Sequence, residues 1–271
     1  MGEFARKAEK ELLNMKNTDS KTLAYINLFA IFGALPKLCE LNDEARALIA
    51  DKKIDMAISV KDGPAGVLHF DGGMVTLTPG DGPCHIRLSF ASPEKFNGMI
   101  DGTVTPIPSK GLTRVGFLLK TFVPLTDILS RYLRPSAENL ADATFYRTST
   151  ILMFHVITGA VAQIGNVDHI GKASASYIVD GNVRMLITEG EEIIAVAHIA
   201  AKDHILTTHP TDTDHVMSQM QFDGIRNARG LFDGDASSFT LICDGKLKMG
   251  GMISQLDNVN RILDRVALYL A

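Results

Sequence analysis

The chain has 271 residues, of which 46% are hydrophobic and 21% charged, and its formal net charge is −4. This composition provides apolar side chains for one large core or two ordinary ones, and it excludes a globally disordered protein. Basic residues occur in runs of no more than two, as at Lys52 and Lys53, which argues against a nucleic-acid-binding protein because phosphate neutralisation needs clustered Lys and Arg.

The N-terminal residues 1–15 are charged throughout and lack the apolar centre of a signal peptide. The three cysteines, Cys39, Cys84 and Cys243, are far apart and show no CxxC spacing. We therefore expect small buried hydrophobes in a reducing compartment and no disulfide or zinc framework. Both features predict a cytoplasmic protein.

Two almost wholly apolar segments follow, at residues 23–35 and 151–164. Each is shorter than the ~20 residues that a bilayer span needs, and Asn27 and His155 interrupt them. They are typical of helices that are apolar nearly all round and lie buried in protein. The sequence therefore predicts no transmembrane segment and leaves a transient contact with a membrane open.

Between these segments the pattern alternates between strand and helix signals. Asn42 is a suitable N-cap for a helix over residues 43–50, and Ser92 with Pro93 begins a second helix that ends at Gly102. Gly111 begins an apolar stretch that we expect to be the last strand, followed by a helix. The expected strands are residues 54–60, 65–70, 74–78, 84–90 and 111–118, and the closing helix is residues 124–133.

Several short segments recur in the same order in the second half of the chain. NGMIDG at 97–102 matches RGLFDG at 229–234, and GLTRVG at 111–116 matches GKLKMG at 245–250. The sequence therefore predicts two tandem copies of one α+β domain, residues 1–135 and 136–271, with an insertion near residues 211–226 in the second copy. The alternative is two unrelated halves that share turn glycines.

This order of elements resembles the sterol carrier protein type-2 family. The resembling residues are the meander at 67–90, the helix start at 92–96 and the strand opened by Gly111, repeated more faintly in residues 174–270. The resemblance implies two domains, each a mostly antiparallel five-stranded sheet covered by helices on one face. It also implies an apolar tunnel that takes a fatty acyl chain, acyl-CoA or sterol-like lipid. The tandem arrangement and the expected insertion depart from the family pattern, and the insertion puts the second tunnel in doubt.

Apolar side chains on the covering helices are the candidate ligand-binding residues, and an ordinary filled core is the alternative for each of them. In the first copy they are Phe96, Met99, Ile100, Phe117, Leu118, Phe122, Leu125 and Leu129. In the second copy they are Met217, Met220, Leu231, Phe232, Met249, Met252, Ile262 and Leu263.

The chain shows no catalytic signature such as GxSxG, a P-loop or GxGxxG. The histidines between His198 and His215 lack the close spacing of zinc ligands, so no metal or other cofactor is expected. The leading hypothesis is a soluble, non-catalytic carrier of an apolar ligand. The alternatives are a structural, accessory or dimerisation subunit without ligand, and an enzyme acting on a hydrophobic substrate. The sequence leaves the oligomeric state open, a homodimer included.

Overall fold

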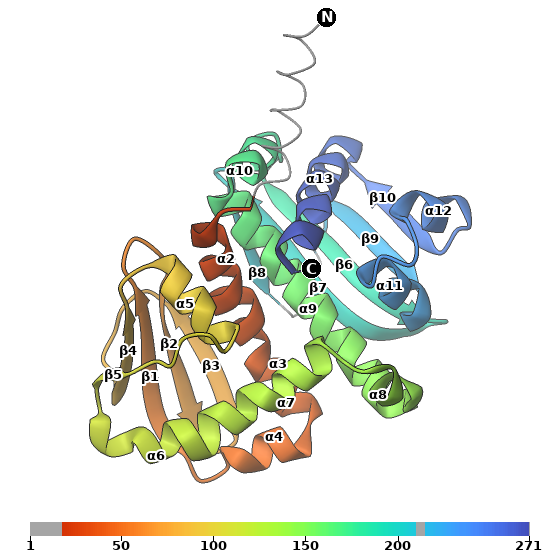
Figure 1. Cartoon of the computed structure of the whole chain (residues 1–271). Helices are drawn as coiled ribbons and strands as arrows, with labels where there is room; N and C mark the ends of the chain where they lie inside the picture. Colours follow the sequence, from red (N-terminus) through yellow and green to blue (C-terminus); the bar gives the residue numbers. More distant parts are fainter. Residues whose placement is uncertain (1–17, 210–214, 271) are drawn as a thin grey trace, which may run out of the picture.

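The computed structural model describes residues 18–209 and 215–270, which form an α+β protein with two five-stranded sheets and helices packed against them (Figure 1). The chain begins with one continuous helix of 22 residues, Ser20–Leu41. This helix contains a π-helical turn and a 3-10 turn. Its segments are α2 (Ser20–Ile26), η1 (Asn27–Ile31), η2 (Phe32–Ala34) and α3 (Leu35–Leu41).

The first sheet follows the short helix α4 (Asp43–Leu48), which Asn42 caps as expected by accepting the backbone N–H of Ala45 at 2.7 Å. The strand order is β3-β2-β1-β4-β5, and α5 (Pro93–Ile100) joins the last two strands. The strands are β1 (Lys53–Val60), β2 (Ala65–Asp71), β3 (Met74–Pro79), β4 (Ile86–Phe90) and β5 (Pro108–Lys110). Because β1 is parallel to β4 while the other neighbours are antiparallel, the sheet is mixed.

The strand expected at residues 111–118 is wrong, because these residues form a helix. Gly111 has a φ of +82°, and a Cβ there would lie 2.4 Å from the carbonyl oxygen of His85, so only glycine fits at this turn. The helix begins directly after it and continues to Leu133. Its segments are η3 (Leu112–Arg114), α6 (Val115–Phe117), η4 (Leu118–Phe122) and α7 (Val123–Leu133).

The second half has a sheet of strand order β10-β9-β6-β7-β8, in which β6 is parallel to β9 and the other pairs are antiparallel. Its helices are α8 (Ala137–Ala141), α9 (Ala143–Val167), α10 (His169–Ala175), α11 (Ile225–Phe232), α12 (Ser238–Cys243) and α13 (Ile253–Leu270). Its strands are β6 (Gly181–Glu189), β7 (Glu192–Lys202), β8 (Ile205–His209), β9 (Ser218–Asp223) and β10 (Leu247–Gly251).

The insertion expected near residues 211–226 falls partly outside the described residues. Within the described part, residues 218–223 are strand β9 and α11 begins at Ile225. The helix α12, between α11 and β10, was not expected. In the first half, no helix stands between α5 and β5.

The two apolar helices pack against each other at the centre of the molecule, as Figure 1 shows for α2 and α9. At their crossing, a Cβ on Gly159 would lie 3.0 Å from the Cβ of Ala30. The helices have 22 and 25 residues, so the expectation that both are too short for a bilayer is wrong. Length and composition would allow either to cross a membrane. However, 61% and 72% of their most apolar windows are buried in the protein, which confirms the expected burial.

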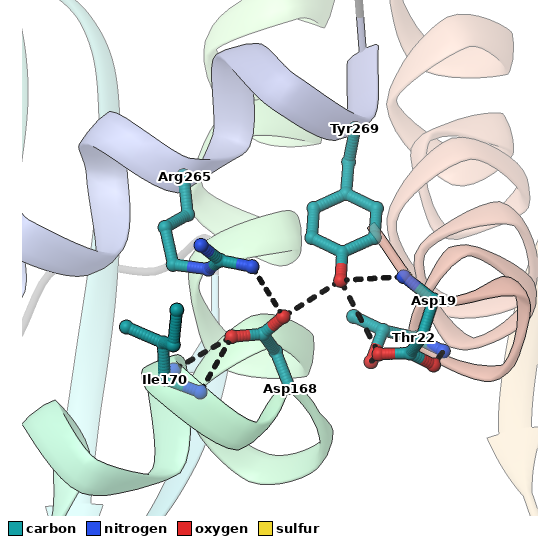
Figure 2. Close-up of polar contacts among 7 residues, drawn as sticks. Asp19, Thr22, Asp168, Ile170, Arg265 and Tyr269 are labelled. Carbon is teal, nitrogen blue, oxygen red and sulfur yellow. Dashed lines mark hydrogen bonds and ion pairs between the residues drawn. The ribbon is translucent and has the colours of Figure 1, made fainter. Parts of the chain in front are cut away.

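A buried polar network ties the start of the first helix to the end of the last (Figure 2). The Tyr269 hydroxyl donates to Asp168 Oδ2 at 2.7 Å and accepts the backbone N–H of Asp19 at 3.2 Å. Asp168 also accepts from Arg265 at 2.7 Å and from the backbone N–H of Gly171. Asp168, Arg265 and Tyr269 are each at least 93% buried, whereas Asp19, the member of the network from the first half, is exposed.

Candidate functional site

The eight candidate residues of the first copy lie together in one apolar core. Phe96 and Leu125 are fully buried. Phe117, Leu118, Phe122 and Leu129 are buried, and Met99 and Ile100 pack against the same core partly exposed. Phenylalanine rings fill its centre: the Phe32 ring centroid lies 6.3 Å from that of Phe96 and 5.6 Å from that of Phe122. These side chains therefore belong to one continuous apolar core.

The candidate residues of the second copy are divided between core and surface. Met220 and Ile262 are fully buried, and Leu231, Phe232 and Leu263 pack partly buried against the core. Met217, Met249 and Met252 are 37–39% exposed. The set therefore spans the core and the surface of the second half, with Met249 paired to Met220 across β10 and β9.

An open depression of about 330 Å³ lies where β1 begins, beside the helix that follows Gly111. It borders the core of the first half, because Phe117 lines it and is only 8% exposed. The lining residues are Lys52, Ile54, Thr113, Arg114, Gly116, Phe117, Lys120 and Thr121. Of these, only Phe117 belongs to the candidate set from the sequence.

The lining combines an apolar floor with a positive rim. Ile54 and Phe117 supply the apolar surface, whereas Lys52, Arg114 and Lys120 supply three cations. Lys52 forms an ion pair with Asp51 at 2.6 Å, and its hydrogen bond holds the pKa of the Asp51 carboxyl below the ordinary value. Within residues 18–209 and 215–270, neither Arg114 nor Lys120 has an ion-pair partner. The depression is thus suited to a ligand with an anionic group and an apolar group.

The floor of the depression leads directly to the phenylalanine cluster. The Phe117 ring packs edge-on against Phe70 at a centroid distance of 5.2 Å, and Phe70 contacts Phe122 at 6.5 Å. Phe117 precedes, and Phe122 ends, the π-helical turn η4. Such turns carry one residue more than an α-helix allows and are common at functional sites. The helix wall between the depression and the core is therefore irregular where the two meet.

A second depression, of about 500 Å³, lies on the opposite face of β1. Asp55 Oδ1 lies 2.7 Å from His69 Nδ1, and the backbone N–H of Asp55 donates to His85 Nδ1 at 3.0 Å. Lys53 and Asp71 also line it. Among the described residues no group of His, Cys, Asp and Glu side chains could hold a metal ion. These ring nitrogens are engaged within the sheet face, which is polar and open to solvent.

The histidines and cysteines considered in the sequence analysis do not form a site in the described structure. His198 is fully buried, and its ring stacks on His209 at 4.9 Å. All three cysteines are unpaired. Cys39 and Cys84 are buried as expected, but Cys243 is exposed, so the expectation of a buried residue is wrong there.

The rim cations were not among the residues predicted from the sequence. Lys52 was noted only as part of a short basic pair, and Arg114 and Lys120 were assigned to an apolar strand and the residues after it. Their spacing of six residues gives no local signal, because only the helix after Gly111 brings them to the start of β1. Recognising that helix would have been the one available route to this site.

Comparison with known proteins gives matches to solved structures over part of the chain only. No family model matches the sequence, and no curated protein matches it. Solved structures of sterol carrier protein 2 do match part of the chain. The apo form from Yarrowia lipolytica is 14% identical with a TM-score of 0.30, covering 38% of this chain and 91% of that one. Sterol carrier protein 2 like 2 from Aedes aegypti is 12% identical with a TM-score of 0.30, covering 42% and 95%.

A third match is the sterol carrier protein 2 of Aedes aegypti, solved in complex with the C16 fatty acid palmitate. It is 12% identical, with a TM-score of 0.29, and covers 40% of this chain and 94% of that one. All three matches extend over about two fifths of the present chain.

Proposed function

We propose that this protein binds an anionic amphiphile, a fatty acid or acyl-CoA type of ligand, in its first half. The observation that carries the proposal is the depression where the cations Lys52, Arg114 and Lys120 surround the apolar surface of Phe117 and Ile54. The anionic group would bind to the cations. The acyl chain would enter between the helix after Gly111 and the sheet.

Desolvation of the acyl chain would supply most of the affinity. Ten methylene groups contribute about 8 kcal/mol when buried, at roughly 0.8 kcal/mol each. Association and the displacement of packed side chains oppose this gain by several kcal/mol, so we expect micromolar affinity. The phenylalanine cluster must shift to admit the chain, and the π-helical turn η4 is the segment proposed to yield.

In this proposal residues 1–135 and 136–271 are tandem copies of one domain, and the first copy carries the ligand. In support, β6 to β10 repeat the order and the directions of β1 to β5. The protein would act in the cytoplasm as a non-catalytic carrier without a cofactor. The three unpaired cysteines suit such a reducing compartment.

A second candidate function is that of an accessory subunit without ligand. The densely packed phenylalanine core favours it, because a filled interior needs no guest. The two proposals differ in whether a fatty acid binds to the isolated protein.

The test is titration of the full chain with palmitate, followed by displacement of a fluorescent fatty acid. The double variant Arg114→Ala/Lys120→Ala should bind at least about tenfold more weakly, because charge-assisted hydrogen bonds to the carboxylate are lost. The matched control is Lys61→Ala/Lys95→Ala, which removes two exposed lysines beyond the far end of β1. Absence of binding to the wild-type protein, or equal affinity in both double variants, would overturn the proposal.

A further inference from the structure

An exposed apolar stripe flanks the depression. Leu112 and Leu119 are each 65% exposed and Val123 is 44% exposed, although all three are large apolar side chains. They are spaced seven and four residues apart, which places them along one side of the helix. None of the three lines the depression. The stripe therefore presents a separate, outward-facing apolar surface.

Basic side chains adjoin this stripe on the same helix. Arg114 and Lys120 lie between its members in the sequence, and neither has an ion-pair partner within the described residues. An apolar face bordered by Lys and Arg is the pattern of helices that lie in the interface of an anionic bilayer. There the apolar side chains enter the acyl boundary while the cations meet the lipid head groups.

An exposed apolar residue outside the stripe shows how the stripe differs from other exposed apolar positions. Ile253, at the start of α13, is 82% exposed. The nearest charged residues that follow it on α13, Asp257 and Arg261, pair with each other at 3.2 Å, and Arg265 pairs with Asp168 at 2.7 Å. Exposed apolar surface at that position therefore lacks unpaired cations on its own helix, whereas the stripe has two.

We propose that the stripe of Leu112, Leu119 and Val123 docks the protein on the surface of an anionic lipid bilayer. This inference rests on the proposed function, since docking sets the mouth of the depression against the membrane. An amphiphile would then pass between bilayer and depression without crossing water. The negative charge of the bilayer attracts Arg114 and Lys120, and the apolar stripe anchors the protein in the bilayer.

The experiment is co-sedimentation of the full chain with two kinds of vesicle. One is phosphatidylcholine alone, and the other contains roughly 30 mol% phosphatidylglycerol, an anionic lipid that attracts Lys and Arg. We expect binding to the anionic vesicles that weakens as salt is raised. The variant Leu112→Ser/Leu119→Ser/Val123→Ser should bind these vesicles at least about tenfold more weakly. The control Ile253→Ser removes an apolar side chain that is more exposed than any in the stripe, and this variant should bind as the wild type does.

Palmitate titration without vesicles separates this inference from the proposed function. The triple serine variant should bind palmitate with wild-type affinity, because its substitutions avoid the depression. Vesicle binding that is absent in the wild type, or unchanged in the triple variant, would overturn the docking surface even if palmitate binds. A wild-type protein that binds vesicles but not palmitate would instead contradict the proposed function.

Discussion

Asp168 is the residue on which three structural roles converge. Its Oδ1 caps α10 by accepting the N–H groups of Ile170 and Gly171, and its Oδ2 accepts from Arg265 and Tyr269. Burial alone raises the pKa of this carboxyl, but the hydrogen bonds from Arg265, Tyr269 and Gly171 outweigh it and hold the pKa below the ordinary 3.8. The carboxylate is therefore charged in the folded protein at neutral pH.

Removing the negative charge of Asp168 should lower the stability of the folded protein. Asp168→Asn keeps a capping side chain but leaves buried Arg265 opposite a neutral group, so the free energy of unfolding should fall by about 3 kcal/mol. Asp142→Asn is the matched control, because Asp142 also caps a helix but pairs with no cation in the described part of the chain. Asparagine caps about as well as aspartate, so this control should change by less than about 0.5 kcal/mol. Urea denaturation at pH 7 measures both values.

The wild type and Asp168→Asn should also differ in their stability at acid pH. Because the folded-state pKa of Asp168 is depressed, its contribution is complete above about pH 4 and is lost as pH falls below that value. The wild type should therefore lose stability relative to Asp168→Asn as the pH falls below about 4. Parallel pH profiles of the two proteins would contradict the charged network.

The role of a residue could be predicted from the sequence only where its interaction partner lies a few residues away. Asn42 was predicted as an N-cap because its partner Ala45 lies three residues away. The contacts of Asp168 with Arg265 and Tyr269 were not predicted, because these residues follow it by about a hundred residues. Its cap of α10 is local and was missed. Arg114 and Lys120 were missed for the same reason, since their proximity to Lys52 exists only in the folded chain.

At the scale of elements, the central contact is the crossing of the first helix with α9. Gly159 lies against Ala30, where a Cβ would come within 3.0 Å of its neighbour. Gly33 lies one turn further along the first helix, and a Cβ there would meet no atom within 4 Å. These two helical glycines therefore offer a direct comparison of close packing with open space.

Substituting each glycine by alanine should have opposite effects. Gly33→Ala should stabilise the protein by about 0.5–1 kcal/mol, because alanine loses less backbone entropy in a helix. Gly159→Ala should destabilise it by about 1–3 kcal/mol, because the added methyl overpacks the crossing. Thermal unfolding of the two variants measures the difference, and stabilisation by Gly159→Ala would contradict the close crossing.

The strands of the first sheet were largely predictable, because β1 to β4 coincide closely with alternating or continuous apolar runs. The helix after Gly111 was not, since its apolar residues fit a strand as well as a helix over a short window. Tertiary contact decides there: Gly111 closes on His85 and turns the chain away from the sheet. The parallel pairing of β1 with β4 likewise depends on chain topology that no local pattern encodes.

At the scale of the whole molecule, the two halves share buried polar contacts as well as the helix crossing. Arg229 donates to the Ser149 hydroxyl at 2.8 Å, and that hydroxyl donates to the carbonyl oxygen of Tyr132 at 2.6 Å. This contact shares no residue with the network of Asp168. The first half, which carries the proposed ligand site, is thus held against the second at several places.

Native mass spectrometry of the full chain, purified without detergent and mixed with palmitate, tests the central claim most directly. We expect one palmitate per chain, bound at the depression with the cationic rim in the first half. Hexadecanol, which has the same chain length without the charge, should bind at least about tenfold more weakly. A spectrum without a palmitate adduct, or with palmitate and hexadecanol retained equally, would contradict it.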